Sequence, residues 1–343
     1  MPTKITITGF IDKLGTLPVV DVRSPGEFYT GHIPGAVNIP IFDNDERAVV
    51  GKAYKKQGRE QAIFRGLEIV GTKLRDFAQK ARSVAQNNEL LVYCWRGGMR
   101  SASMAWLFET IGIHCYILID GYKSYRKYGK IQLTKGEKLI ILGGYTGSGK
   151  TAILHELAKQ GEQVLDLEKL ANHKGSAFGA LGQDEQPPNE HFENLLIREW
   201  LTFDLSKPIW LEDESKSIGS NWIPGELYDR MRKGEVLKIE LDKQTRIQRL
   251  MKEYAVYDAK YLEHCVLKIS KRLGGQNTKQ ALESLENGTL KDVADIALTY
   301  YDKSYHFGLD KREKNTIYPV SLKTDNPKKN AGILIDFARK NIF

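Results

Sequence analysis

The stretch that decides the fold of the larger part of this chain is KLIILGGYTGSGKTAILHELAKQG, residues 138–161. LIIL is an apolar run with the length of a buried strand, and AILHELAKQ has the apolar spacing of an amphipathic helix. Between them, Gly144–Thr151 matches G-x-x-x-x-G-K-[ST] in the strand–loop–helix context that a phosphate-binding P-loop requires. The sequence therefore predicts an α/β domain that binds phosphate groups.

The residue types of this loop suit that chemistry. Glycines let backbone N–H groups turn toward phosphate oxygens, and the helix N-terminus adds partial positive charge. Lys150 is predicted to reach the terminal phosphate, and the Thr151 hydroxyl to hold Mg²⁺. The predicted phosphate- or diphosphate-binding residues are Gly144, Gly147, Ser148, Gly149, Lys150 and Thr151. Any pyrophosphate compound would suit this loop, and nucleotide hydrolysis does not follow from the motif.

An acidic segment downstream is the predicted companion of the phosphate loop. In PIWLEDESKSIG, residues 208–219, an apolar strand delivers Glu212, Asp213 and Glu214 at its end. In P-loop proteins an acidic group at this place binds the metal ion. We expect a Mg²⁺ site formed by Thr151 and Asp213, with a solvated acidic turn as the alternative. The sequence does not say which of the three acids faces the phosphate.

A second loop, YCWRGGMRS at residues 93–101, places Cys94 at the end of the predicted strand NELLVYC. A cysteine thiolate is stabilised by nearby cations and by a helix N-terminus. Arg96 and Arg100 supply cations, and a helix is predicted from Ser101. The spacing Cys94-x5-Arg100-Ser101 is that of cysteine phosphatases, whose loop grips a phosphoryl group. We therefore predict Cys94 as the nucleophile, with Arg100 and Arg96 as its anion-binding partners.

The pattern of elements predicts two α/β domains. The first alternates strands with helices and extends over residues 1–128, which indicates a parallel sheet. The segment GYKSYRKYGKIQLTKGE, residues 121–137, is polar, basic and rich in Tyr; its last part, residues 129–136, is the predicted linker, and the P-loop domain is predicted at 137–343. From about residue 242 the second domain becomes helical. The remaining cysteines, Cys115 and Cys265, lie in an apolar strand and a helix, as small buried hydrophobic residues do.

The charge balance points to a polyanionic partner. The chain has 343 residues and a net charge of +8. Residues 225–343 hold 23 Lys and Arg against 17 Asp and Glu, an excess of 6. The helix TRIQRLMKE places Arg246, Arg249 and Lys252 three apart on one face, and YRKYGK near the linker mixes Tyr with cations. For each cluster a solvated basic face is the alternative. The predicted nucleic-acid contacts are Arg246, Arg249, Lys268, Lys271 and Arg272.

Cysteine use and hydropathy bear on the compartment. Three cysteines without C-x-x-C spacing argue against a disulfide framework or a zinc site. The start MPTKITITGF lacks a signal-peptide pattern, and no apolar run approaches the ~20 residues that span a bilayer. We expect a cytoplasmic protein without membrane contact.

Two family resemblances sharpen these predictions. VVDVRSPGEFYTGHIPGAVNIP, residues 19–40, resembles the signature of rhodanese-type sulfurtransferases, so the first domain is expected to be rhodanese-like. The common sulfurtransferase loop is one residue shorter than the Cys94 loop. Taken with VVGKAYKKQGREQAIFRG (residues 49–66), CWRGGMRS, GGYTGSGKT and LEDESKSIG, the chain resembles the tRNA 2-selenouridine synthase family over nearly its whole length.

That resemblance implies a transferase acting on tRNA. In the family, wobble 2-thiouridine in the tRNAs for Lys, Glu and Gln is S-geranylated with geranyl diphosphate, and selenophosphate then gives 2-selenouridine. Carried over, Cys94 bears the selenium as a perselenide. Both donors are co-substrates, no tightly bound cofactor is expected, and an enzyme that supplies selenophosphate is a candidate partner. GSAFGALG, residues 175–182, is a candidate lining of a geranyl groove or an ordinary loop.

Two other functions fit parts of the sequence. The first is a rhodanese-type sulfurtransferase or Cys phosphatase with the P-loop domain as a regulatory ATPase. The second is a nucleotide-switched module that binds tRNA or protein without catalysis. Turnover of thiolated tRNA with selenophosphate would separate both from the synthase.

Overall fold

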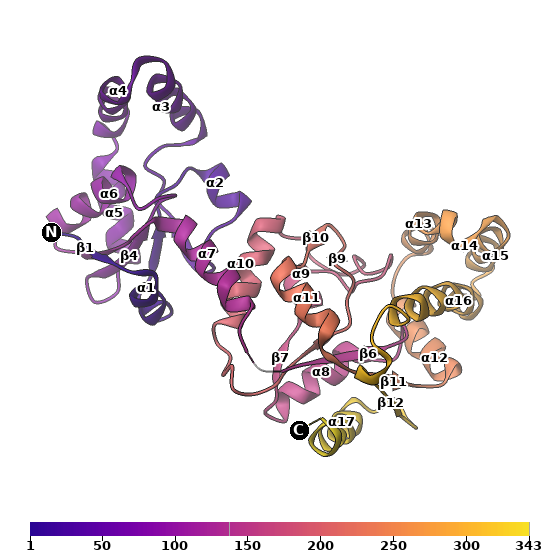
Figure 1. Cartoon of the computed structure of the whole chain (residues 1–343). Coiled ribbons are helices and arrows are strands. Elements are labelled where there is room, and N and C mark those ends of the chain that lie inside the picture. Colours follow the sequence, from indigo (N-terminus) through magenta and orange to yellow (C-terminus); the bar gives the residue numbers. More distant parts are fainter. Residues whose placement is uncertain (137, 343) are drawn as a thin grey trace. The chain divides into compact units, whose positions relative to one another are not determined.

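The computed structural model describes residues 1–136 and 138–342 and divides into two compact units (Figure 1). Unit 1 comprises Met1–Gln132 and Pro188–Arg198, and unit 2 comprises Leu133–Pro187 and Glu199–Phe343. Each unit contains a five-stranded sheet whose strand pairs are all parallel. The predicted α/β class is confirmed.

The sheet of unit 1 has the order β1-β5-β4-β2-β3. Its strands are β1 (Thr3–Ile5), β2 (Val19–Asp21), β3 (Ala36–Asn38), β4 (Glu89–Tyr93) and β5 (His114–Leu118). β4 is central and buried from Leu90 to Tyr93, as expected for a parallel strand covered on both faces. The sequence predicts β4 and β5 from their apolar runs, whereas β1 and β3 are three-residue strands with exposed or half-buried side chains and give no apolar signal.

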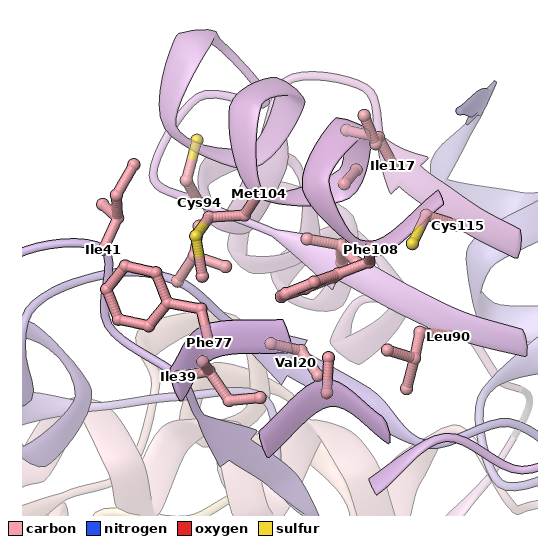
Figure 2. Packing of buried hydrophobic residues seen from close by; sticks show 14 of the residues in the cluster. Val20, Ile39, Ile41, Phe77, Leu90, Cys94, Met104, Phe108, Cys115 and Ile117 are labelled. Atoms are coloured by element: carbon pink, nitrogen blue, oxygen red, sulfur yellow. The ribbon is translucent and has the colours of Figure 1, made fainter. Parts of the chain in front are cut away.

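Helices flank this sheet, some packed on its faces around an apolar core and one pair projecting from one end of the unit (Figure 1). They are α1 (Ile7–Lys13), α2 (Pro25–Thr30), α3 (Asn44–Gln57), α4 (Arg59–Gly71), α5 (Leu74–Val84), α6 (Met99–Thr110) and α7 (Gly121–Leu133). Figure 2 shows part of the core, where Phe77 and Phe108 pack beside Val20 and Leu90 of the strands. The stretch 58–85, whose apolar residues have helical spacing, forms two helices, because the chain turns at Thr72 and Lys73.

The sheet of unit 2 has the order β12-β11-β6-β8-β7. Its strands are β6 (Leu139–Gly144), β7 (Gln163–Leu165), β8 (Ile209–Glu212), β11 (Glu235–Glu240) and β12 (Ile317–Ser321), beside a small antiparallel pair, β9 (Ser217–Ile218) and β10 (Asn221–Trp222). The sequence reading omitted β12, which contains Pro319. A proline suits an edge strand, and β12 lies at the edge of the sheet.

The C-terminal part of unit 2 is mainly helical, as predicted. The unit contains α8 (Lys150–Lys159), α9 (Leu167–Ala171), α11 (Gly225–Lys233), α12 (Lys243–Tyr254), α13 (Ala259–Lys268), α14 (Ser270–Leu273), α15 (Gly275–Glu286), α16 (Leu290–Leu309), the short 3₁₀ turn Lys314–Thr316 and α17 (Pro327–Asn341). Helices α13 to α16 share an apolar core of their own, formed by residues such as Leu262, Leu285 and Val293. Within the described residues, no helix combines the length and apolar character needed to cross a bilayer.

The segment around the predicted linker is mostly helical in the structure. The segment read as a polar linker is helical as far as Leu133, and Tyr122 and Tyr125 in it are fully buried. The tyrosine rings pack inward, so Tyr125 is not available for base stacking. Unit 1 also takes Pro188–Arg198, the larger part of α10 (Asn189–Trp200), from the middle of the second predicted domain.

Candidate active site

The phosphate loop lies between β6 and α8, at the carboxyl end of the central strand of unit 2. Gly144, Gly147 and Gly149 all have positive φ, at 146°, 80° and 81°, which only glycine adopts readily. The Lys150 amino group donates to the Gly144 carbonyl oxygen at 3.0 Å, at the mouth of the loop. The buried Ser148 hydroxyl has no hydrogen-bond partner among the described residues. A buried unpaired hydroxyl in a loop of this type suits an oxyanion ligand.

Carboxylates surround the first turn of α8. Thr151 donates its hydroxyl to Glu168 of α9 at 2.7 Å. Burial raises the pKa of Glu168 against the lowering effect of Thr151 and Lys150. Burial, and then the charge of Glu168, raise the pKa of Glu214 to about 8, which Lys150 opposes. Burial also raises the pKa of Glu212, and nearby carboxylates raise it further. This is an acidic site held close to one lysine, where a cation would lower every one of these pKa values.

The Cys94 loop lies at the carboxyl end of β4, the central strand of unit 1, and leads into α6. Its backbone is packed tightly against the start of α7. A Cβ atom on Gly121 would lie 2.2 Å from the Cys94 carbonyl oxygen, and φ is +56° at Gly121. The Tyr122 N–H donates to that same oxygen at 2.9 Å. The contacts with the start of α7 therefore fix the backbone of the Cys94 loop.

The Cys94 sulfur faces polar partners on the other side of the loop. Its Sγ atom lies 3.2 Å from the Ser101 hydroxyl, which donates to the Gly98 carbonyl at 3.0 Å. Because Ser101 is in the first turn of α6, the sulfur lies at the positive end of this helix. The first N–H groups of a helix have no carbonyl partner within it. Sulfur, hydroxyl and N–H groups thus form an anion-binding arrangement.

Arg100, in the first turn of α6, is held by the carboxylate of Glu27 in α2. Glu27 Oε2 accepts from Arg100 Nη1 at 2.8 Å and from Arg47 Nε at 2.9 Å. Burial alone would raise the pKa of Glu27, but Arg100 and Arg47 outweigh it and lower the pKa to about 2. The carboxylate therefore stays ionised and orients Arg100, whereas Arg96 is exposed to solvent.

The comparisons with known proteins cover both units. The family model described as tRNA 2-selenouridine synthase AAA domain matches residues 137–324, and the rhodanese-like domain model matches residues 8–128. A protein of Nitrosomonas europaea named tRNA 2-selenouridine synthase is 31% identical over 357 aligned positions, which cover 89% of this chain and 92% of that protein. The chain belongs to the tRNA 2-selenouridine synthase family.

Solved structures align with separate parts of this family member. The N-terminal domain of a protein from Clostridium difficile 630, described as ATP/GTP binding, is 41% identical and covers 37% of this chain and 98% of that chain, with a TM-score of 0.35. A rhodanese-like domain protein from Staphylococcus aureus is 22% identical and covers 36% of this chain and 90% of that chain, with a TM-score of 0.24.

The cysteines of this family member differ in their surroundings. Figure 2 shows Cys94 at the rim of the apolar cluster, whereas Cys115 lies among Ile117, Phe108 and Leu90. Burial raises the pKa of Cys115 to about 12, and it also raises that of Cys265. A thiol with a raised pKa is a poor nucleophile at neutral pH. The prediction that these two cysteines are buried hydrophobic residues agrees with the structure.

The predicted role of Asp213 is not supported. Its carboxylate is engaged by Arg312, whose side chain is fully buried, and by the Tyr305 hydroxyl at 3.2 Å. β8 ends at Glu212, so Asp213 lies just beyond the strand, and these two contacts occupy its carboxylate. The acid that touches Thr151 is Glu168, which follows β7. Its signal in the sequence was present, because DLEKL places acids after a predicted strand.

The metal-site prediction changes accordingly. Among the described residues, no group of three or more His, Cys, Asp or Glu side chains is arranged as a metal site by itself. Mg²⁺ commonly binds through one or two carboxylates together with substrate phosphates. The Thr151 hydroxyl and Glu168 carboxylate fit that kind of site.

Two of the predicted tRNA contacts lie instead at the phosphate loop. Arg246 is 4% exposed; it pairs with Asp302 through two hydrogen bonds of 2.8 Å and donates to the Thr146 carbonyl. Arg249 pairs with Asp325 at 2.6 Å, and its guanidinium carbon lies 3.0 Å from where a Cβ atom on Gly149 would stand. Both arginines therefore lie against the phosphate loop rather than on an open basic surface. Lys252, Lys268, Lys271 and Arg272 are exposed.

An apolar cavity opens beside the phosphate loop. Thr146 of the loop contributes to its wall, together with Ser176 and Phe178 of the predicted GSAFGALG lining. The remaining wall comes from α12, α13 and α16 and from residues next to them: Leu250, Met251, Tyr254, Leu262, Leu290, Val293, Ala294, Ala297, Leu298 and Tyr301. A mostly apolar pocket with a polar group at one end suits a ligand that has an anionic head and a hydrocarbon chain.

Proposed function

We propose that this protein converts wobble 2-thiouridine in tRNA to S-geranyl-2-thiouridine with geranyl diphosphate, and then to 2-selenouridine with selenophosphate. Membership of the family and the name of the Nitrosomonas protein support the overall activity. The observation that supports the two-step form is the presence of two separate anion loops, one with a lysine and acids and one with a cysteine and arginine.

The first step is assigned to unit 2. Gly144–Thr151 would hold the diphosphate, and Lys150 would neutralise the charge that develops on it as it leaves. The geranyl chain would lie in the apolar cavity beside Thr146 and Phe178. The thiouridine sulfur attacks the terminal carbon of the chain, the C–O bond breaks, and diphosphate departs. Mg²⁺, held by Thr151, Glu168 and the diphosphate, would supply further charge neutralisation.

The second step is assigned to the Cys94 loop of unit 1. Selenophosphate is a tetrahedral oxyanion, and Arg100 offers it a fixed guanidinium. Arg100 spends one N–H group on Glu27, which leaves its other donors for the oxyanion. Cys94 is the nucleophile of this step. Selenium finally replaces the geranylthio group at C2 of the uridine, so the sulfur leaves with the geranyl chain.

Binding of the tRNA is assigned to the basic residues that are exposed to solvent. Lys252, Lys268, Lys271 and Arg272 are exposed on α12, α13 and α14. Such contacts neutralise phosphates, so affinity should fall steeply with salt. The tRNAs for Lys, Glu and Gln are the proposed substrates, and an enzyme that supplies selenophosphate is the proposed protein partner. The cytoplasm is the proposed compartment.

The decisive experiment supplies the substrates singly and together. Thiolated tRNA is incubated with the protein and geranyl diphosphate, selenophosphate, both or neither, and the nucleosides are analysed by mass spectrometry. We expect S-geranyl-2-thiouridine with geranyl diphosphate alone and 2-selenouridine with both. Formation of 2-selenouridine without geranyl diphosphate would contradict the two-step form. No modified nucleoside under any condition would contradict the proposed function.

A further inference from the structure

We propose that Cys94 attacks the phosphorus atom of selenophosphate, so that the phosphoryl group is transferred to the cysteine and selenium is released as selenide. This inference rests on the proposed function, since selenophosphate is the donor assigned there. It gives the Cys94 loop a phosphoryl-transfer activity and distinguishes the atom attacked from the atom delivered to the tRNA.

The donors of the loop bind oxygen, and they therefore orient the donor molecule. The Arg100 guanidinium, held by Glu27 at 2.8 Å, and the N–H groups at the start of α6 are hydrogen-bond donors. If they hold the three oxygens, phosphorus faces the Cys94 sulfur and selenium points out of the loop. Attack on selenium would require the opposite orientation, with the oxygens away from every one of these donors. The spacing of Cys94 and Arg100 is the one that cysteine phosphatases use for phosphorus.

The electron balance favours the same atom. When the thiolate attacks phosphorus, an S–P bond forms and the P–Se bond breaks, with its electron pair leaving on selenium. Water then attacks phosphorus, the S–P bond breaks, and phosphate and thiolate are regenerated. No atom is oxidised or reduced. Attack on selenium would instead leave the pair on phosphorus at the oxidation level of phosphite, and a perselenide made with release of phosphate would need a two-electron oxidant.

Ser101 suits the return of the thiolate. Its hydroxyl lies 3.2 Å from Cys94 Sγ and now donates to the Gly98 carbonyl. If the hydroxyl rotates, it can donate a hydrogen bond to Cys94 Sγ instead. That hydrogen bond stabilises the thiolate as the leaving group. Selenide released at the mouth of the loop is then the nucleophile that displaces geranylthiolate from C2 of the uridine.

The test follows the two elements of the donor separately. The full chain is mixed with selenophosphate labelled with ³²P or with ⁷⁵Se, with and without S-geranylated tRNA, and quenched during turnover. The label on the Cys94 peptide is counted, because phosphoryl and selenium adducts add nearly the same mass. Phosphate release is followed in parallel. Cys115→Ser serves as the matched control for Cys94→Ser, since Cys115 is buried in the same core.

We expect ³²P on Cys94, no ⁷⁵Se there, and loss of phosphate release in Cys94→Ser but not in Cys115→Ser. Arg100→Lys keeps the positive charge but loses the pair of parallel N–H donors of the guanidinium. It should slow phosphate release by about 10²-fold. Selenium on Cys94, absence of ³²P from it during turnover, or undiminished phosphate release by Cys94→Ser would each overturn the inference. If the wild type still makes 2-selenouridine in such an experiment, only this inference fails and the proposed function holds. If the wild type makes no 2-selenouridine, the proposed function itself is contradicted.

A second observation concerns the surface of helices α3 and α4. In Figure 1 they lie side by side at one end of unit 1, away from the label of β4. Tyr54, Phe64 and Leu67 are 60%, 53% and 61% exposed. From residue 52 to residue 68 the exposed cations are Lys52, Lys55, Lys56, Arg59 and Arg65, and the exposed acids are Glu60 and Glu68, of which Glu68 pairs with Arg65 at 2.7 Å.

We infer that this α3–α4 surface binds the tRNA substrate through unpaired nucleotides. Lys52, Lys55 and Lys56 share one face of α3, since they are three and four residues apart. Exposed aromatic rings among cations fit single-stranded RNA, in which bases stack on rings while cations hold the phosphates. The surface is linked to the Cys94 loop within unit 1, because Arg47 of α3 and Arg100 share the Glu27 carboxylate.

Binding of thiolated tRNA to full-length variants tests this surface. Replacing Lys52, Lys55 and Lys56 by Gln should reduce the slope of log affinity against log salt by about 2. Tyr54→Ala with Phe64→Ala should weaken binding about tenfold or more. The controls are Lys4, Arg75 and Lys80 replaced by Gln, which removes the same charge from exposed positions of unit 1, and Trp106→Ala, which removes a ring that is 62% exposed.

Two outcomes would overturn the tRNA surface. In the first, the variants of the α3–α4 surface bind tRNA as tightly as a tightly binding wild type. Alternatively, sedimentation could show that the wild type self-associates and that Tyr54→Ala with Phe64→Ala abolishes this without changing tRNA affinity, which would make the surface a protein interface. Wild-type protein that does not bind thiolated tRNA at all would instead contradict the proposed function.

Discussion

The Cys94 loop and the phosphate loop are built on the same plan and differ in what surrounds them. Each follows the central strand of a five-stranded parallel sheet, β4 or β6, and leads into a helix. Ligands commonly bind at the carboxyl ends of such strands. Around Cys94 the fixed neighbours are a hydroxyl and an arginine. Around Lys150 they are acids with raised pKa values.

This difference suggests two kinds of catalysis from one backbone design. A sulfur beside Arg100 and Ser101 can act as a covalent nucleophile toward an anionic donor. A lysine within a group of carboxylates can hold a polyphosphate together with a cation and neutralise a leaving diphosphate. The following changes should separate the two loops.

The largest expected effect is that of Cys94→Ser. Formation of 2-selenouridine should fall by at least about 10³-fold, because a serine hydroxyl is a far weaker nucleophile than a thiolate. Geranylation of thiolated tRNA should change by no more than about twofold. Nucleoside mass spectrometry measures both products, with Cys115→Ser as control. Retention of selenation would remove Cys94 from the reaction.

Lys150→Ala should affect the other step. Geranylation should fall about 10²- to 10³-fold, since a group that stabilises the leaving diphosphate is lost. Selenation of tRNA that is already geranylated should continue at about the wild-type rate. Lys159→Ala, at the exposed end of the same helix, is the control. Loss of both steps in a folded Lys150→Ala protein would show that the loops are not separate.

Glu27→Gln should produce a smaller effect on the Cys94 loop. It removes the charge-assisted hydrogen bond to Arg100, worth about 1.5–3 kcal/mol, and a weaker one to the half-exposed Arg47, which water screens. Selenation should slow about tenfold. Folded Glu27 has a pKa of about 2 against 4.5 for the free group. Its contribution to stability is therefore present above pH 4.5 and lost as the pH falls toward 2.

Chemical unfolding of the wild type and Glu27→Gln at several pH values measures that contribution. The difference in unfolding free energy should shrink as the pH falls from about 4.5 to 2. A difference that is the same at every pH would show that the charge of Glu27 does not stabilise the loop.

The smallest expected effect concerns Glu214 in the acidic site. In the folded protein the pKa of Glu214 is about 8, against an ordinary value of 4.5. Between these values the unfolded chain ionises while the folded protein holds the proton, so stability should decline as the pH rises. Glu214→Gln should flatten that decline, by at most about 1.4 kcal/mol per pH unit. Glu263→Gln, an exposed acid on α13, should leave the profile unchanged.

Much of this architecture could be predicted because its signals are local. Gly144–Thr151 and Cys94–Ser101 each carry strand, loop and helix within a short stretch, and both loops form as expected. The apolar runs of β4, β6, β8 and β11 are buried strands, for which hydropathy is a direct guide.

The partners of the loops could not be predicted in the same way. Glu27 and Arg100 are 73 residues apart in the sequence, and Thr151 meets Glu168 only after β7 has paired with β8. Asp213 lies one residue beyond the end of β8 and pairs with Arg312, which is 99 residues away in the sequence. Arg246 and Arg249 show the limit of charge patterns, because both pair with acids from other segments, Asp302 and Asp325, whereas Lys252 of the same predicted face is exposed.

The most direct test of the account is complementation between two inactive variants. Thiolated tRNA is incubated with geranyl diphosphate and selenophosphate in the presence of Cys94→Ser, Lys150→Ala or an equal mixture of the two. If the loops serve consecutive steps, neither variant alone makes 2-selenouridine and the mixture does, because one supplies the geranylated tRNA that the other consumes. A mixture as inactive as each folded variant alone would contradict the assignment of one step to each loop.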